Sequence, residues 1–165
     1  MLTPLTAADA PALQPLFERC AEFWELIEGA KPAPRKALEE LTSIAPGRTI
    51  DDTFTFGVRE DDQLIAFVQL ARGYPKESEW WIGLLLLDPA NRGRGLGAEI
   101  HREIAAWVEA QGATALGLMV QIQNEAAYGF WRRMGYVERG RQPYHEPTII
   151  VMSLPLGGSS AQVSF

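Results

Sequence analysis

The 165-residue sequence predicts a mixed α/β fold, with a mostly antiparallel central sheet of about six or seven strands flanked by helices. Three segments between residues 53 and 87 have the apolar patterns of strands and are separated by short polar or glycine-containing turns. A glycine-rich turn then leads into an amphipathic helix, and another apolar strand follows that helix. This strand–helix–strand unit predicts one right-handed crossover in an otherwise antiparallel sheet.

The first part of the chain is predicted to be mainly helical. Leu2–Leu5 is a candidate for a short first strand, and the spacing of apolar residues predicts a long helix from about Pro11 to Ile27. Its apolar stripe consists of Leu13, Leu16, Phe17, Cys20, Trp24 and Ile27. Cys20 belongs to this stripe, so we interpret it as a core thiol and not as a nucleophile. Prolines separate this helix from a second one over Arg35–Ile44.

Acidic and aromatic residues lie close together near the end of the long predicted helix. They are Glu22, Phe23, Trp24, Glu25 and Glu28. One interpretation is that they form a wall of a binding pocket. The other is that the aromatic residues belong to the core and the acids to a solvated face, which is the commoner meaning of such a stripe.

Strands are predicted for the middle of the chain. Thr53–Arg59 alternates between apolar and polar residues, Glu60–Asp62 is a polar hairpin turn, and Gln63–Ala71 is the returning strand. Glu79–Leu87 is apolar on both faces from Trp80 onward, which predicts a strand in the middle of the sheet.

Helices and strands alternate in the rest of the chain. The predicted elements are a helix over Gly95–Gln111, a strand over Thr114–Val120, a helix over Glu125–Met134, a strand beginning at Tyr136 and a last strand over Thr148–Leu154. Asn124 is the expected N-cap of the second of these helices, and Gly135 ends it. We expect His101, in the first helix, to lie at the surface.

The glycine-rich turn is the most informative motif. Gly93, Gly95 and Gly97 allow a ligand to approach the backbone closely, and the free N–H groups at the start of the next helix favour a diphosphate. Arg92 and Arg94 add positive charge there. The turn lacks the Lys-Ser/Thr of a P-loop, and its glycine spacing differs from that of a Rossmann dinucleotide site.

Composition limits the classes of function. The net charge of −6 argues against a general nucleic-acid-binding protein, and no apolar run is long enough to span a membrane. Cys20 is the single cysteine, which excludes an intrachain disulfide and a cysteine metal cluster. Between residues 92 and 141 there are seven arginines against five glutamates, so a polyanionic cofactor suits this region and a cationic acceptor suits the acidic remainder. These features, without a secretory signal at the N-terminus, predict a cytoplasmic protein.

Two motifs resemble those of the GNAT superfamily, the acyl-CoA-dependent N-acetyltransferases. Arg92-Gly93-Arg94-Gly95-Leu96-Gly97 matches the family signature (Gln/Arg)-x-x-Gly-x-(Gly/Ala). The second motif has Asn124, Ala127, the pair Phe130-Trp131 and the pair Gly135-Tyr136 at the spacing of the later family motif. The resemblance implies a V-shaped cofactor cleft, with residues 1–156 as a single acetyltransferase domain and residues 157–165 as a tail.

The resemblance also implies the residues that bind acetyl-CoA, with no metal. They are Leu85, Leu86, Leu87, Arg92, Gly93, Arg94, Gly95, Leu96, Gly97, Ala98, Asn124, Ala127, Tyr128 and Trp131. The strand backbone at residues 85–87 would pair with the pantetheine arm and polarise the thioester carbonyl. The amides of residues 93–98 would hold the pyrophosphate, Asn124 would bond near the pantetheine end, and the other helix residues would line the thiol end.

The sequence departs from the family pattern at two positions that handle protons. Many members have a tyrosine as general acid where this chain has Trp131, and some have a glutamate where it has Met119. The indole N–H barely ionises, so our candidate acid is Tyr128, with departure of an unassisted thiolate as the alternative. Other candidate acids are Tyr136 and Tyr144, and the candidates for the unassigned general base are Glu79, Asp52, His145 and Glu146.

The function implied by the resemblance is transfer of an acetyl group from acetyl-CoA to a primary amine of a small molecule or a protein, by direct attack in a ternary complex. The alternative is a catalytically degenerate module that binds CoA as a sensor, because the usual acid and base are missing. Members of this family often form homodimers, and Val163 and Phe165 in the tail are candidates for such a contact.

Overall fold

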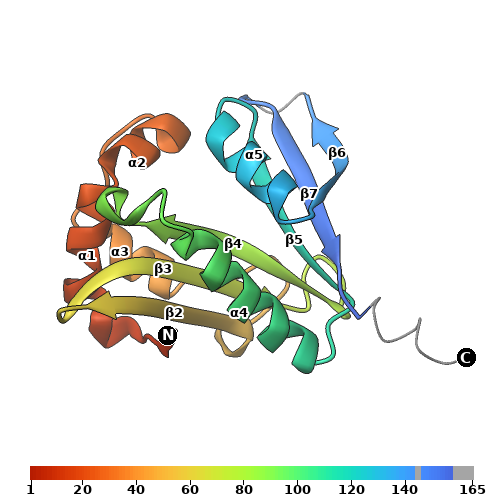
Figure 1. Cartoon of the computed structure of the whole chain (residues 1–165), viewed down its shortest axis with the longest axis horizontal. Helices are drawn as coiled ribbons and strands as arrows, with labels where there is room; N and C mark the ends of the chain where they lie inside the picture. The colour runs from red at the N-terminus through yellow and green to blue at the C-terminus, as the bar shows by residue number, and fades with distance from the viewer. Residues whose placement is uncertain (144–145, 158–165) are drawn as a thin grey trace, which may run out of the picture.

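The structure is a computed structural model that describes residues 1–143 and 146–157. Its elements follow one another along the chain and are drawn in Figure 1. They are β1 (Thr3–Pro4), η1 (Ala7–Asp9), α1 (Ala10–Arg19), α2 (Ala21–Glu28), α3 (Lys36–Leu41), η2 (Ile50–Asp52), β2 (Thr53–Glu60), β3 (Gln63–Arg72), β4 (Glu79–Leu87), η3 (Pro89–Asn91), α4 (Leu96–Ala110), β5 (Ala115–Gln121), α5 (Glu125–Arg133), β6 (Val137–Gln142) and β7 (Ile149–Pro155). The predicted fold class is confirmed.

The described strands form one seven-stranded sheet in the order β1-β2-β3-β4-β5-β7-β6. All neighbouring pairs are antiparallel except β4 and β5, which are parallel and are connected through α4. This is the predicted crossover, and β4 lies in the middle of the sheet as its continuous apolar sequence predicted.

The sheet opens between β4 and β5. These strands pair only at Glu79–Trp81 with Ala115–Gly117, and beyond that point they diverge, with α2 beside one arm and α5 beside the other (Figure 1). A β-bulge lies just past the paired part: Leu70 pairs with Ile82 and Gln69 with Leu84, so Gly83 is an extra residue in β4. Among the described residues, the edge of β4 that faces β5 therefore has no ladder partner from the bulge to the end of the strand.

The bulge also changes which face of the sheet each β4 side chain joins. Before it, Trp80 and Ile82 pack in the core cluster that contains Ile100 and Ile104 of α4. After it, Leu84 and Leu86 pack in a second cluster, with Leu13, Leu16, Phe17 and Trp24 of α1 and α2. The two clusters lie on opposite faces of the sheet, and β4 contributes to both.

The prediction of one long N-terminal helix is wrong in one respect, because the structure has two helices, α1 and α2, in its place. Cys20 has φ −93° and ψ 26°, which is outside the helical region, so the chain turns there. The apolar stripe is buried as predicted, with Cys20 1% exposed and Trp24 1% exposed. The second predicted helix is shorter than expected, since α3 covers only Lys36–Leu41.

Several sequence predictions concern residues outside the described part of the chain. They are the roles suggested for Tyr144 and His145 and the dimer contact suggested for Val163 and Phe165. Among the described residues, no helix has the length and apolarity needed to cross a membrane.

Candidate functional site

A cavity of about 430 Å³ lies where β4 and β5 diverge. It is lined from three sides, by α2, by the end of β4 with the glycine-rich turn, and by α5. The lining residues that were predicted from the sequence to bind the cofactor are Leu85, Leu86, Leu87, Arg92, Gly93, Gly97, Asn124, Ala127 and Trp131. The structure therefore brings the two sequence motifs together across one opening.

Other predicted cofactor residues do not line this cavity. Gly95 and Ala98 are at the start of α4, and Arg94 and Leu96 line a separate hollow beside Met1 and Arg59. Conversely, the cavity is lined by residues that the cofactor prediction missed: Glu22, Phe23, Leu26, Ala126 and Phe130. Glu22 and Phe23, from the suggested pocket wall, line this cavity, whereas Trp24 is in the core.

The glycine-rich turn has the backbone that an anion site requires. Gly93 and Gly95 have φ values of +75° and +81°, and a Cβ added at either one would meet nothing within 4 Å. The first hydrogen bond of α4 runs from the Glu99 N–H to the Gly95 carbonyl (3.1 Å). The N–H groups of residues 96–98 thus have no acceptor within the helix and are free for an anion.

Gly97 has a different role from the two glycines before it. A Cβ there would lie 3.3 Å from the Phe130 ring and 3.7 Å from Leu87, so the missing side chain lets α4 approach α5 and the end of β4. The third glycine of the motif therefore sets the packing of the two helices that border the cavity.

Arg92 is folded back onto the end of β4. Its Nε and Nη2 atoms donate to the Leu87 carbonyl at 3.2 and 3.1 Å. The same carbonyl accepts from the Cys20 thiol at 3.3 Å. Cys20 is thus the predicted core thiol, and burial raises its pKa to about 11. Its sulfur also lies 3.9 Å from Arg92 Nη2 of the glycine-rich turn.

A partly buried ion pair ties α1 to the same turn. Arg19 Nε lies 2.6 Å from Asp88 Oδ2, and the Arg19 guanidinium also donates to the Leu64 carbonyl. The other Asp88 oxygen accepts from the Ala90 N–H at 3.0 Å and caps the 3₁₀ helix that begins the turn. Asp88 is only 6% exposed, so these bonds fix where α1 ends relative to the glycine-rich turn.

On the other arm, Asn124 caps α5, as predicted. Its Oδ1 accepts from the Ala127 N–H at 3.2 Å. Tyr128 is on this helix but does not line the cavity, and its hydroxyl lies 3.4 Å from Arg132 Nη1. Trp131 does line it and is 7% exposed.

Trp131 is held by an aromatic cluster that includes His101. The His101 ring is 5.8 Å from the Trp131 ring, and its Nε2 lies 3.0 Å from the Tyr136 hydroxyl. His101 is 4% exposed, so its predicted surface position is wrong, and burial lowers its pKa. Burial raises the pKa of Tyr136, which does not line the cavity and serves as a buried partner of His101.

Two of the candidate general bases, Asp52 and Glu79, do not line the cavity between β4 and β5. Asp52 forms ion pairs with Arg48 and Arg72 at 3.2 and 3.0 Å. A hydrogen bond from the Thr49 backbone, with these two arginines, lowers the pKa of Asp52 to about 2. Glu79 is at the paired start of β4, whereas the cavity is at the diverging end of that strand.

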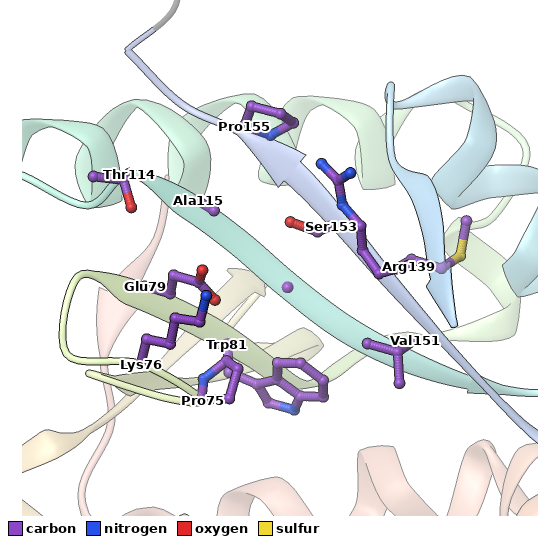
Figure 2. Close-up of a pocket in the computed structure, with 12 residues that line it drawn as sticks. Pro75, Lys76, Glu79, Trp81, Thr114, Ala115, Arg139, Val151, Ser153 and Pro155 are labelled. Atoms are coloured by element: carbon purple, nitrogen blue, oxygen red, sulfur yellow. The ribbon is translucent and has the colours of Figure 1, made fainter. Parts of the chain in front are cut away.

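Glu79 lines a second hollow of about 500 Å³ at the paired end of β4 and β5. Figure 2 shows Glu79, Trp81 and Lys76 on one side of β5, with Arg139 and Ser153 on the other. The Trp81 ring lies against Gly117, where an added Cβ would be 2.9 Å from it. This hollow shares no lining residue with the cavity between the arms.

The two arms of the cleft are joined by glutamine side chains. Gln121 Nε2, at the end of β5, donates to the Ile27 carbonyl of α2 at 3.0 Å. Gln123 Nε2 donates to the Leu26 carbonyl at 3.3 Å. These bonds fix the end of α2 over the end of β5, so α2 remains beside the cavity. Among the described residues, no group of three or more His, Cys, Asp or Glu side chains could hold a metal ion.

Comparison with known proteins agrees with this architecture. An uncharacterized protein of Mycobacterium leprae is 28% identical over 153 residues, which is 87% of this chain and 40% of that protein. The N-alpha-acetyltransferase RimI of Mycobacterium tuberculosis is 30% identical over 145 residues, 86% of this chain and 81% of that protein. The chain thus spans less than half the length of the first curated relative and most of the second.

Solved structures share the fold. An acetyltransferase from Thermus thermophilus has a TM-score of 0.81 and 24% identity, covering 94% of this chain and 96% of that one. The aminoglycoside acetyltransferase AAC(6')-Ib, in complex with coenzyme A, has a TM-score of 0.75 and 16% identity, covering 99% of each chain. The sequence profile of the acetyltransferase (GNAT) family matches residues 13–136, a span that contains both motifs of the cleft. The chain therefore belongs to the GNAT acetyltransferase family.

Proposed function

We propose that this protein transfers an acetyl group from acetyl-CoA to a primary amine, which attacks the thioester directly in a ternary complex. The observation that carries the proposal is the cavity between the diverging strands, with the glycine-rich turn at its border. The family and the coenzyme A complex of a structural relative support acetyl-CoA as the donor.

The residues around the cavity fit such a cofactor. The open space over Gly93 and Gly95 and the free amides at the start of α4 suit the pyrophosphate. The unpaired edge of β4 at Leu85–Leu87 suits the pantetheine amides, which would add to it like a short strand. Asn124, Ala127 and Trp131 would border the arm on the α5 side.

Acetyl-CoA would supply the activated acyl carbon, and the protein would orient it and stabilise charge. A free N–H on the unpaired edge of β4 would polarise the thioester carbonyl. Amine attack forms the C–N bond and expels the CoA sulfur. Tyr128 is the candidate donor of a proton to that sulfur, and unassisted departure of the thiolate is the alternative. A Tyr128→Phe variant with lower kcat and unchanged KM supports the first, whereas unchanged kcat supports the second.

The test of the function is binding followed by turnover. Acetyl-CoA should raise the Tm of the parent protein, and Gly95→Glu should abolish the shift by placing a carboxylate at the anion site. Thiol release from acetyl-CoA is then measured with a panel of small amines and a peptide with a free N-terminus, since one relative is an N-alpha-acetyltransferase. No Tm shift in the parent protein would contradict the proposal.

A CoA-binding sensor is the second candidate function. It is favoured by Trp131 and Met119, which replace the usual acid and base, and by the position of Tyr128 outside the cavity lining. If the protein is a sensor, acetyl-CoA should raise its Tm in the same way, but no amine in the panel should cause thiol release. Turnover of any amine above the rate of acetyl-CoA hydrolysis would exclude it.

A further inference from the structure

The cavity between the arms has two chemically different ends. Backbone amides and glycines border it at the start of α4, which is the end that suits an anionic cofactor. At the α2 end its lining consists of Glu22, Phe23 and Leu26. Glu22 and Arg92 are the ionisable residues in the lining, and Glu22 is the one carboxylate.

The other polar side chains of the lining are already engaged. Arg92 donates twice to the Leu87 carbonyl, and Asn124 accepts from the Ala127 N–H. Glu22, by contrast, has no ion pair or side-chain hydrogen bond with another residue in the described part of the chain. Glu28 on the same helix differs from Glu22, because its carboxylate forms an ion pair with Lys36 at 2.6 Å.

The helix that carries Glu22 is held in a defined place. Glu22 is in the first turn of α2, where the helix dipole favours a negative charge. The Cys20 thiol bonds the junction before it to the end of β4, and the bonds from Gln121 and Gln123 fix the other end of the helix. A carboxylate fixed at the apolar end of a cavity is complementary to a cation that enters from that side.

We propose that Glu22 binds the protonated amine of the acceptor and selects cationic acceptors. This rests on the proposed function, because it assigns a residue to the acceptor side of the same cavity. The ammonium group pairs with the carboxylate, gives up one proton to it, and the neutral amine then attacks the acyl carbon. Because Glu22 is exposed to solvent as well as to the cavity, it passes that proton to water. The new amide nitrogen then loses a second proton, which balances the proton that the CoA sulfur takes up through Tyr128 or, after unassisted departure, from water.

The test compares Glu22→Gln with Glu25→Gln. Both residues are exposed on α2, but only Glu22 lines the cavity, so the second variant controls for the loss of one negative charge from the helix. The acceptors are n-butylamine, spermidine and a pentapeptide with a free N-terminus. Glu22→Gln should raise the KM for the acceptor about tenfold, which corresponds to about 1.4 kcal/mol. The KM for acetyl-CoA should stay within about twofold of the parent, and Glu25→Gln should match the parent for both substrates.

The salt dependence of the acceptor KM and the affinity for the acceptor test whether Glu22 acts through its charge. A purely structural role of Glu22 would change neither quantity in this way. Raising the salt concentration should increase the acceptor KM of the parent and leave that of Glu22→Gln unchanged. Calorimetry of spermidine with the CoA-loaded protein should show binding to the parent and Glu25→Gln and much weaker binding to Glu22→Gln and Glu22→Lys. Equal acceptor KM or equal affinity in the two Gln variants, or no spermidine binding to the CoA-loaded parent, would overturn the assignment. No Tm shift with acetyl-CoA would instead contradict the proposed function.

Discussion

Replacing Asp88 with alanine should cost more stability than any exposed ion pair of this protein. Asp88 is 6% exposed and accepts from Arg19 Nε at 2.6 Å and from the Ala90 N–H at 3.0 Å. Removing one partner of a buried pair typically costs about 3–5 kcal/mol, but the Arg19 side chain is 30% exposed and water offsets part of that. We therefore assign about 2–3 kcal/mol to the pair and about 1 kcal/mol to the cap.

The total of about 3–4 kcal/mol should lower the Tm by roughly 10 °C in a domain of this size. Urea unfolding of the parent and of Asp88→Ala should show a lower midpoint and an unchanged m-value. The control is Arg141→Ala, which breaks the exposed pair with Glu138 and should cost less than about 1 kcal/mol. In a double-mutant cycle with Arg19→Met, the coupling should be about 2 kcal/mol. A loss for Asp88→Ala no larger than that of the control would refute the reasoning.

Three further predictions concern the cleft and the groups buried beside it. Gly97→Val should raise the KM for acetyl-CoA several-fold, because its side chain would meet the Phe130 ring and push α4 from α5; an unchanged KM would contradict this role. Burial lowers the pKa of His101 below 6.5, so below that pH the unfolded chain binds a proton that the native protein does not. The free energy of unfolding should therefore fall as pH decreases from 6.5 to 5.5, and His101→Gln should reduce this fall. The Cys20 thiol, with its pKa near 11, should not react with Ellman's reagent at pH 8 until the protein is unfolded in guanidinium, and rapid reaction of the native protein would contradict its burial.

The strands and the glycine-rich turn were predictable because local patterns determine them. Alternating or continuous apolar residues specify how each strand is buried, and the glycine-rich turn needs backbone conformations that few other residues adopt. Gly93 and Gly95 do have positive φ values, and Asn124 does cap α5. Each of these features depends on residues within a few positions of one another.

The features that the sequence did not predict depend on distant partners. His101 is buried because Tyr136, 35 residues later, bonds to its ring. The apolar stripe continues through Cys20 and therefore does not predict the break between α1 and α2. The Cys20 thiol bonds to the Leu87 carbonyl, 67 residues away in the sequence. Tyr128 is a candidate from sequence because it lies three residues before Trp131 on the same helix. At about 100° per residue, however, it is beyond the edge of the stripe formed by residues 126, 127, 130 and 131, which line the cavity.

The glutamine bonds across the cleft have a consequence for the width of its opening. The carbonyls of Leu26 and Ile27 belong to the last turn of α2, where a helix has no internal donors for them. Gln121 at the end of β5 and Gln123 just after it provide the donors instead. The two arms are thus joined at both ends, by the β4–β5 ladder at the paired end of the strands and by the glutamine side-chain amides at the diverging end. Widening the opening would break these glutamine bonds and expose two helix carbonyls. The residues that limit the width of the cleft therefore lie at the end of α2 and just beyond β5.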